Sequence, residues 1–402
     1  MNFQAGQQMI NYSDMFYRPA KILFISIIII LAVLLLSFLL WSFKVKRPME
    51  ILVMNKAVQS VSRHEHKAAF WILNYNRFVR KSGKSYNHRK DYYGFFPIKP
   101  YRYKEYDVRN IRFNDIDSLA DHYDMAWFID TYGLSFGEWY GDVADETYSR
   151  MLYGGLNQED YFYIREMLLR NKPVIAEFNF FASPTSDLLR TKTEELAGIY
   201  WSGWTGTYYD NMDYNENSDL PSRIINLYKE QNQGSWPYSR SGIILLNHEN
   251  RVLVLENETH IEIELPLITT AADKAARYGV SPVIHFPCRF DICYATDTSN
   301  VISYYELYPT AEGDSILRKN NIPSRFPAVI GNFDNGPFYY LAGSFSDYDI
   351  KMFTSRFSGS RSFDFILLRD MVGSKGRFFS EFYYPFISTV ITDYYETLPG
   401  NE

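Results

Sequence analysis

The chain of 402 residues has only two cysteines and no long run of basic residues. Cys288 and Cys293 lie in the segment CRFDIC, and their spacing is not that of a zinc ribbon. Two cysteines cannot form a disulfide framework, so we expect buried thiols, with one disulfide as the alternative if the domain is exported. A formal net charge of −6 without a basic stripe argues against a nucleic-acid partner.

The sequence signatures of several cofactor and metal sites are also missing. There is no glycine-rich motif of the P-loop or dinucleotide-binding type, and no HExxH spacing. His64 and His66 flank Glu65, but on a helix their side chains would point to different faces. We therefore expect no cofactor and no metal.

One feature that is present is a long apolar run, ILFISIIIILAVLLLSFLLWSF, at residues 22–43. It carries no charge and is long enough to cross a bilayer as a helix. A cleaved signal peptide has a shorter apolar core and a small-residue cleavage site, and neither fits here. We expect a short tail over residues 1–21 followed by an uncleaved single-pass membrane anchor.

The charges that flank this run leave the orientation open. Arg18 and Lys21 precede it, and Lys44, Lys46 and Arg47 follow it. The excess of positive charge on the C-terminal side of the run favours a cytoplasmic main domain, but long domains translocate largely regardless of charge. A short tail before a single anchor is also the usual layout of an exported domain. Between these alternatives, we expect the main domain outside the cytoplasm.

Strand and helix patterns alternate over residues 48–235. Apolar runs predict strands at 49–55, 124–130, 173–178 and 199–203. Amphipathic spacing and capping residues predict helices at 65–81, 116–123, 157–171, 183–198 and 222–231. The turn-rich residues 81–100 are expected to be a surface excursion. This alternation predicts an α/β domain with a flavodoxin-like, mostly parallel sheet and helices on both faces.

Two of these helices have marked starts and ends. Asn157 is the expected N-cap of one, with Asp160 completing a capping box. Ser183 is the expected N-cap of the other, with Pro184 in its first turn and Gly198 at its end.

Residues 236–350 are β-rich. Hairpins are expected at 241–257, 290–310 and 326–343, either in a second subdomain or as an antiparallel continuation of the sheet that its last strand rejoins. The C-terminal segment, 351–402, is expected to be partly helical.

Polar side chains follow the predicted strands at the edge where open α/β sheets bind ligands. Each one taken alone is more often a turn or cap residue than a functional one, but the set would form one cleft. Asp130 and Glu177 are the candidate catalytic carboxyls. The candidate ligand-binding residues are Lys56, His64, His66, Tyr132, Asn179, Thr185 and Trp204.

The order of DMAWFIDTYG, YGG, KPVIAEFNFFASPT, GIYWSGWTG and PFYYLAGSFSD resembles the class I glutamine amidotransferase-like superfamily. The likeness is to its ThuA-like and β-galactosidase middle-domain-like branch, over residues 49–235 and 326–347. Enzymes of this superfamily carry a cysteine in a tight elbow after a strand. Here the elbow has Asn179, Phe180, Phe181 and Ala182, and Ser183 lacks a G-x-S-x-G context, so the resemblance implies a domain without glutaminase activity.

These patterns support three expectations of function. The first is a bacterial, membrane-anchored ligand-binding or assembly component with a carbohydrate or membrane-protein partner, and a cell-surface polysaccharide system is the setting we expect for it. This expectation is based on the resemblance and on the aromatic residues Trp201, Trp204, Tyr208 and Tyr209, which could stack on sugars. The simpler interpretation of these aromatic residues is that they belong to the core. The second is a carbohydrate-active hydrolase that uses Asp130 or Glu177 as acid or base. The third is a purely structural subunit of a membrane complex.

Overall fold

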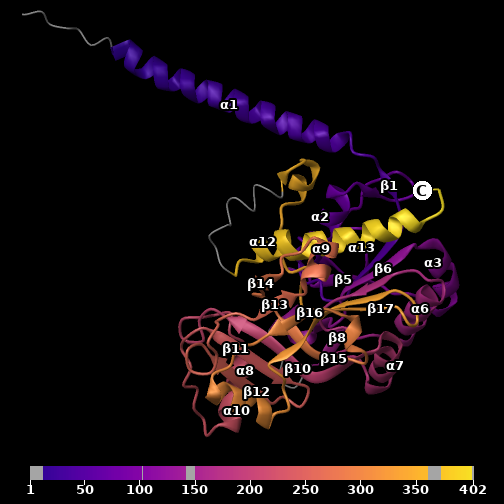
Figure 1. Ribbon diagram of the computed structural model, residues 1–402, viewed down its shortest axis with the longest axis vertical. Helices are drawn as coiled ribbons and strands as arrows, with labels where there is room; N and C mark the ends of the chain where they lie inside the picture. Colours follow the sequence, from indigo (N-terminus) through magenta and orange to yellow (C-terminus); the bar gives the residue numbers. More distant parts are fainter. Residues whose placement is uncertain (1–11, 102, 142–149, 361–372, 401–402) are drawn as a thin grey trace, which may run out of the picture.

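The computed structural model describes residues 12–101, 103–141, 150–360 and 373–400 (Figure 1). Within these residues, a large sheet has the strand order β14-β13-β16-β17-β18-β9-β6-β2-β4-β5. A smaller sheet has the order β12-β11-β10-β15, and β1-β3 and β7-β8 are short pairs.

The strands have the following bounds. They are β1 (Arg47–Pro48), β2 (Ile51–Asn55), β3 (Phe78–Val79), β4 (Tyr93–Lys99), β5 (Glu105–Arg109), β6 (Met125–Asp130), β7 (Leu134–Ser135), β8 (Met151–Tyr153), β9 (Val174–Ala176), β10 (Ile199–Tyr209), β11 (Gly242–Asn247), β12 (Val252–Glu256), β13 (Leu267–Thr270), β14 (Val283–His285), β15 (Phe290–Ala295), β16 (Val301–Glu306), β17 (Arg325–Asn332) and β18 (Phe338–Leu341).

The α-helices are α1 (Tyr12–Ser42), α2 (Lys67–Tyr75), α3 (Ile116–His122), α4 (Phe136–Tyr140), α6 (Gln158–Leu169), α7 (Asp187–Ala197), α8 (Ser222–Gln231), α9 (Ala272–Tyr278), α10 (Ala311–Lys319), α12 (Lys375–Phe378) and α13 (Tyr384–Thr397). Shorter helical turns are η1 (His64–His66), η2 (Phe113–Asp115), η3 (Thr298–Asn300), η4 (Met352–Arg356) and the π-helical η5 (Phe379–Tyr383).

The large sheet is mixed. Its strands β4, β2, β6, β9 and β18 run parallel to their neighbours within that group. Strand β5 on one side, and β17, β16, β13 and β14 on the other, are antiparallel to theirs. The α/β class is therefore confirmed, but the sheet is not mostly parallel. The reason is that β18 enters beside β9 as the second strand of a hairpin and brings antiparallel partners with it.

The strand expected at 199–203 belongs to the other sheet. Strand β10 continues to Tyr209 and pairs with β11 on one edge and β15 on the other, both antiparallel. The four predicted strand ends therefore do not lie along one edge. The expected hairpin at 290–310 is also wrong, because β15 pairs with β10 whereas β16 pairs with β13 and β17.

Two local predictions are wrong: the helix expected at 65–81 is shorter than its pattern suggests, and part of the expected surface excursion at 81–100 is a buried strand. Helix α2 ends at Tyr75, since Arg77 takes a left-handed φ of 61° and Val79 then lies in β3. Residues 81–100 are not only a surface excursion, because β4 joins the large sheet and buries Phe95 and Phe96.

The expected caps give a divided result. Asn157 and Asp160 form the predicted capping box of α6, and Gly198 ends α7 with a φ of 67°. Ser183, however, is not the N-cap of α7. The helix begins at Asp187 after Ser186.

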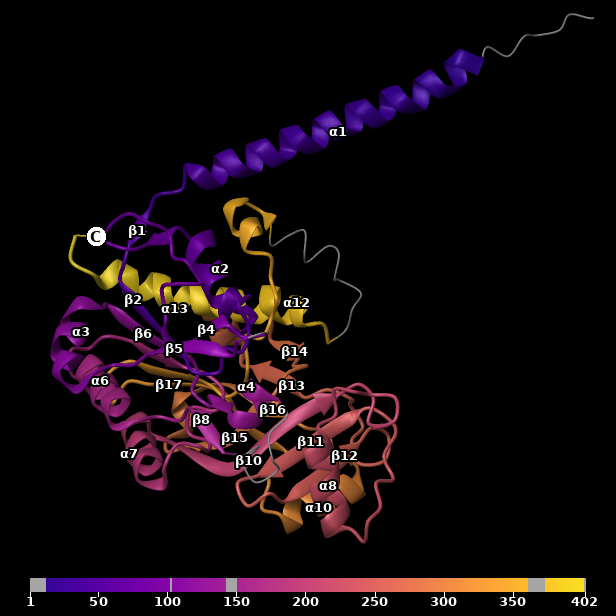
Figure 2. The ribbon, with the colours of Figure 1, turned by 180° about the vertical axis from the view of Figure 1, so that it is seen from behind.

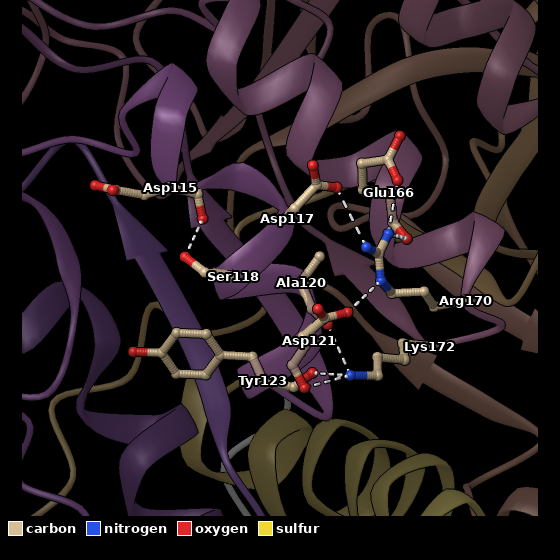
Figure 3. Close-up of polar contacts among 9 residues, drawn as sticks. All are labelled: Asp115, Asp117, Ser118, Ala120, Asp121, Tyr123, Glu166, Arg170 and Lys172. Carbon is tan, nitrogen blue, oxygen red and sulfur yellow. Dashed lines mark hydrogen bonds and ion pairs between the residues drawn. The ribbon is translucent and has the colours of Figure 1, made fainter.

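Helices α3 and α6 pack together beside the sheet and are joined by two cations (Figure 3). Lys172 Nζ donates to the carbonyl oxygens of Ala120, Asp121 and Tyr123 at 2.7–3.0 Å, at the C-terminal end of α3. Those carbonyls lack partners within the helix, so the lysine acts as a C-terminal cap. The Arg170 guanidinium reaches carboxylates on both helices, those of Asp117, Asp121 and Glu166.

Helix α1 leaves the body of the molecule (Figures 1 and 2). Its segment Lys21–Ser42 is long and apolar enough to cross a membrane, and its apolar side chains from Ile22 to Leu40 are largely exposed. Near its C-terminal end it contacts α2 and η4. Trp41 Nε1 donates to the Asn74 carbonyl oxygen at 3.2 Å, and the Arg77 guanidinium lies 4.4 Å from the centre of the Trp41 ring.

Candidate functional site

Glu177, expected as a catalytic carboxyl, lies in the interior with 1% of its surface exposed. Its carboxylate accepts hydrogen bonds from Trp127 Nε1 (2.9 Å), Tyr383 Oη (2.6 Å) and the Ser346 backbone N–H (3.2 Å). Burial raises the pKa of Glu177 to about 7, and these hydrogen bonds oppose the rise. Both carboxylate oxygens therefore accept hydrogen bonds, and these bonds link β6, β9 and the C-terminal helices.

Lys56 lies in a different place, against α6. Its Nζ donates to Asp160 Oδ2 (2.5 Å) and to the Gly155 carbonyl oxygen (2.7 Å), and the residue is 1% exposed. It shares no hydrogen-bond partner with Glu177, which faces η5. The structure does not bring this lysine and this glutamate together at one open edge.

Three further candidates make internal contacts. His66 is buried, its Nε2 donates to the His88 carbonyl oxygen (2.7 Å), and burial lowers its pKa to about 3. Thr185 is also buried, and its Oγ1 accepts from the Leu156 backbone N–H (2.9 Å). Trp204, expected to be exposed in the cleft, is 7% exposed in the core. His64 lies nearer the surface, beside the hydroxyls of Ser60 and Ser62.

The turn after β9 has the backbone shape of an elbow. Asn179 takes a φ of 62°, a left-handed conformation that asparagine adopts more readily than most residues. Its backbone N–H donates to Asp291 Oδ2 (2.9 Å), and its carbonyl oxygen accepts from Thr131 Oγ1 (3.1 Å). The turn is therefore held by its main chain, and the residue with the left-handed conformation carries an amide side chain.

Asp130, at the end of β6, lies in a group of charged residues that reaches the surface. We call Asp130, Tyr132, Glu65, Asp291 and Arg289 the strand-end cluster. Asp130 and Tyr132 are half-buried and Arg289 is exposed, and Asp130 Oδ1 accepts from the Tyr132 backbone N–H (2.8 Å). The charges of Arg289, Asp291 and Glu65 all act on Asp130.

The three acids of the strand-end cluster favour the protonated state more than free carboxyls do. The pKa of Asp130 is raised to about 7, chiefly by burial and in smaller part by the charges of Asp291 and Glu65, while the Tyr132 hydrogen bond and the charge of Arg289 oppose the rise. Burial also raises the pKa of Asp291 to about 6 and shifts that of Glu65 upward. Acids with pKa values near neutrality can exchange protons at physiological pH, and such groups gather at functional sites.

Several polar atoms at this edge have no hydrogen-bond partner within the described part of the chain. They are Asn55 Nδ2, Glu65 Oε2 and Asp291 Oδ1. The Arg289 guanidinium forms no hydrogen bond or ion pair with the described residues either. The Arg289 guanidinium is exposed and can therefore bind a ligand directly, whereas the three unpaired atoms are themselves buried and mark an incompletely paired interior behind it.

Sequence reasoning missed three members of this cluster. Arg289 and Asp291 lie between the two cysteines of CRFDIC, where only the thiols drew attention, and Glu65 lies between His64 and His66. An available signal was the charge of Asp291 within an otherwise uncharged strand and the arginine directly before that strand. The thiols themselves are free and buried as expected, and burial raises the pKa of Cys288 to about 12.

Metal chemistry has little support in the part of the chain that the structure describes. No group of three or more His, Cys, Asp or Glu side chains there is arranged to hold a metal ion.

A cavity of about 970 Å³ lies elsewhere, between the first half of β2 and the paired strands β4 and β5. Strand β4 pairs with β2 only at Met54 and Asn55, so the two strands diverge beside the cavity. None of the predicted site residues lines it. Much of its charge is internally paired, since Arg80 contacts Glu50 and Asp91, and Arg109 donates to the Lys90 carbonyl oxygen (2.8 Å). We therefore take the strand-end cluster, with its unpaired groups, as the candidate site.

Comparison with models of known protein families gives no match, and comparison with curated proteins gives none either. The candidate site therefore rests on geometry and electrostatics.

Proposed function

We propose that the protein is a single-pass membrane protein whose main domain binds a polar ligand at the strand-end cluster. The observation that carries this proposal is the exposed guanidinium of Arg289, which has no hydrogen-bond or ion-pair partner among the described residues and whose charge acts on the half-buried carboxyl of Asp130. A cation, carboxyls and a tyrosine together can donate to and accept from a hydroxyl-rich ligand such as a saccharide. A role as a component of a bacterial cell-surface polysaccharide system, with the main domain outside the cytoplasm, follows from this ligand class and the anchor.

The fold relationship is part of the same proposal. The parallel group β4-β2-β6-β9-β18 would be the flavodoxin-like unit of an amidotransferase-like domain, and the turn at Asn179 would be its elbow. Both cysteines lie on or next to β15, Cys293 is fully buried, and the elbow carries no thiol, which supports a domain without glutaminase activity.

The binding proposal is tested with the full chain in lipid nanodiscs and a panel of neutral and uronic-acid oligosaccharides. Arg289→Gln and Asp130→Asn are expected to weaken binding about tenfold or more, because each removes a charge-assisted hydrogen bond of about 1.5–3 kcal/mol. Arg318→Gln, an exposed arginine on α10, is the matched control. Equal affinity of all three variants and the wild type would contradict the proposed site.

A carbohydrate-active hydrolase is the second candidate, favoured by the pKa of about 7 at Asp130. A carboxyl that is partly protonated at neutral pH suits a general acid, and Asp291 or Glu65 would be its partner. Wild-type turnover of a bound oligosaccharide, lost in Asp130→Asn, would establish this function. Tight binding without turnover would exclude it for that ligand.

A further inference from the structure

The segment Lys351–Ser360 lies against helix α1 (gold, beside α1 in Figures 1 and 2). The Ser358 backbone N–H donates to the Ser37 carbonyl oxygen (3.1 Å), and Ser37 Oγ donates to the Ser358 carbonyl oxygen (2.7 Å). The rings of Phe38 and Phe357 lie 6.2 Å apart. The segment is therefore fastened to α1 at the level of Ser37.

This level is inside the apolar segment of α1, which runs to Ser42. Ser37 lies five positions before Ser42, and each position adds 1.5 Å along the helix, so the contact lies about 7.5 Å from the end of the segment. Apolar faces of proteins that lie on a bilayer are buried about 5–10 Å into the boundary between lipid headgroups and acyl chains. A surface that contacts a membrane-crossing helix at this depth therefore lies in that boundary.

The segment has the composition that this boundary favours. Phe353 is 66% exposed although it lies in a folded turn, and Met352 and Phe357 are half-buried. Lys351 and Arg356 are exposed, and no acidic residue occurs between them. Aromatic and basic side chains together are typical of residues at the surface of a bilayer.

The segment is also held firmly by the domain. Trp71 Nε1, on α2, donates to Thr354 Oγ1 (2.8 Å), and the Gly359 backbone N–H donates to Tyr75 Oη (3.1 Å). Because α2 fixes one side of the segment and α1 the other, Phe353 cannot leave the vicinity of the anchor without breaking these contacts.

We propose that residues 351–360 rest in the headgroup region of the bilayer that α1 crosses, as a second, non-spanning membrane contact. The proposal rests on the anchor role proposed above for α1. Phe353 and Met352 enter the boundary, while Lys351 and Arg356 face lipid phosphates. This contact would fix the orientation of the domain relative to the membrane, and with it the orientation of the strand-end cluster.

The test places an environment-sensitive fluorophore on single introduced cysteines in the full chain, in phosphatidylcholine–phosphatidylglycerol vesicles containing spin-labelled lipid. The native thiols are buried, so they do not compete for the label. The three variants are Phe353→Cys, Leu35→Cys within α1, and Phe113→Cys, an equally exposed phenylalanine on η2. Quenching by the spin-labelled lipid at position 353 is expected to be at least about threefold stronger than at 113, with a blue-shifted emission.

Strong quenching at 35 with position 353 no different from 113 would overturn the second contact and leave the anchor intact. Absence of quenching at both 35 and 353 would overturn the anchor and, with it, the second contact.

Discussion

Glu177 and Asp130 are both acids at the end of a parallel strand, yet their surroundings give them different roles. Asp130 keeps an unbonded carboxylate oxygen in a cluster that reaches the surface, whereas Glu177 is closed in by Trp127, Tyr383 and Ser346. The sequence pattern predicted the strand end at Asp130 correctly and placed the end of the other strand two residues too late, since β9 ends at Ala176. It could not separate them, because Tyr383 lies 206 residues away along the chain.

Substitution of Glu177 tests the structural role directly. In Glu177→Gln, an amide nitrogen replaces one acceptor oxygen, so at least one buried donor loses its partner. The free energy of unfolding is expected to fall by about 1–3 kcal/mol, measured by chemical denaturation in detergent. Glu195→Gln, on the exposed side of α7, should leave it unchanged. Equal stability of Glu177→Gln and wild type would show that the buried carboxylate is not needed.

The raised pKa values predict how stability changes with pH. Asp130 and Glu177 titrate near pH 7 and Asp291 near pH 6 in the folded protein, above their ordinary values of 3.8 and 4.5. The folded state therefore binds protons more tightly than the unfolded state, so their stabilisation is complete below about pH 4 and is lost as the pH rises through 6 and 7.

The free energy of unfolding should accordingly decrease between pH 4 and pH 7.5, and Asp130→Asn should make this decrease shallower. Urea denaturation at a series of pH values measures both slopes. An unchanged slope in Asp130→Asn would mean that this carboxyl has an ordinary pKa in the folded protein.

At the scale of single elements, prediction succeeded where the signal was local. The capping box of α6 needs only Asn157 and Asp160, three residues apart, and it forms as predicted. The placement of β10 failed because it depends on β11 and β15, whose hydrogen bonds on both edges draw the strand into the smaller sheet. An apolar run indicates a strand but not its neighbours.

The lysine that caps α3 is an element-scale contact with a measurable effect. Lys172→Met keeps the apolar stem and removes the ammonium that binds three carbonyl oxygens (Figure 3). Stability is expected to fall by about 1–3 kcal/mol, with faster amide hydrogen exchange across α3. Lys192→Met, at an exposed position on α7, is the control. Exchange in α3 that matches the wild type would contradict the capping role.

Across the whole molecule, the anchor and the domain meet through a small set of contacts rather than a free linker. The Arg77 guanidinium stacks on Trp41 and donates to the Ser42 carbonyl oxygen (3.2 Å), while Ser37 is hydrogen-bonded to Ser358, just after η4. These contacts lie on both sides of the last turn of α1, so the direction of the helix relative to the sheet should be narrowly defined.

This predicts a narrow distance distribution between nitroxide labels at positions 35 and 113, measured by pulsed electron resonance in nanodiscs. The double variant Trp41→Leu, Arg77→Ala removes the cation–π contact, worth about 0.5–2 kcal/mol, and three hydrogen bonds, so the distribution should broaden. Arg318→Ala, far along the chain on α10, should leave it narrow. A broad distance distribution in the wild type would contradict this prediction. It would mean that the domain takes many orientations relative to α1, so that α1 does not fix the orientation of the strand-end cluster toward the membrane.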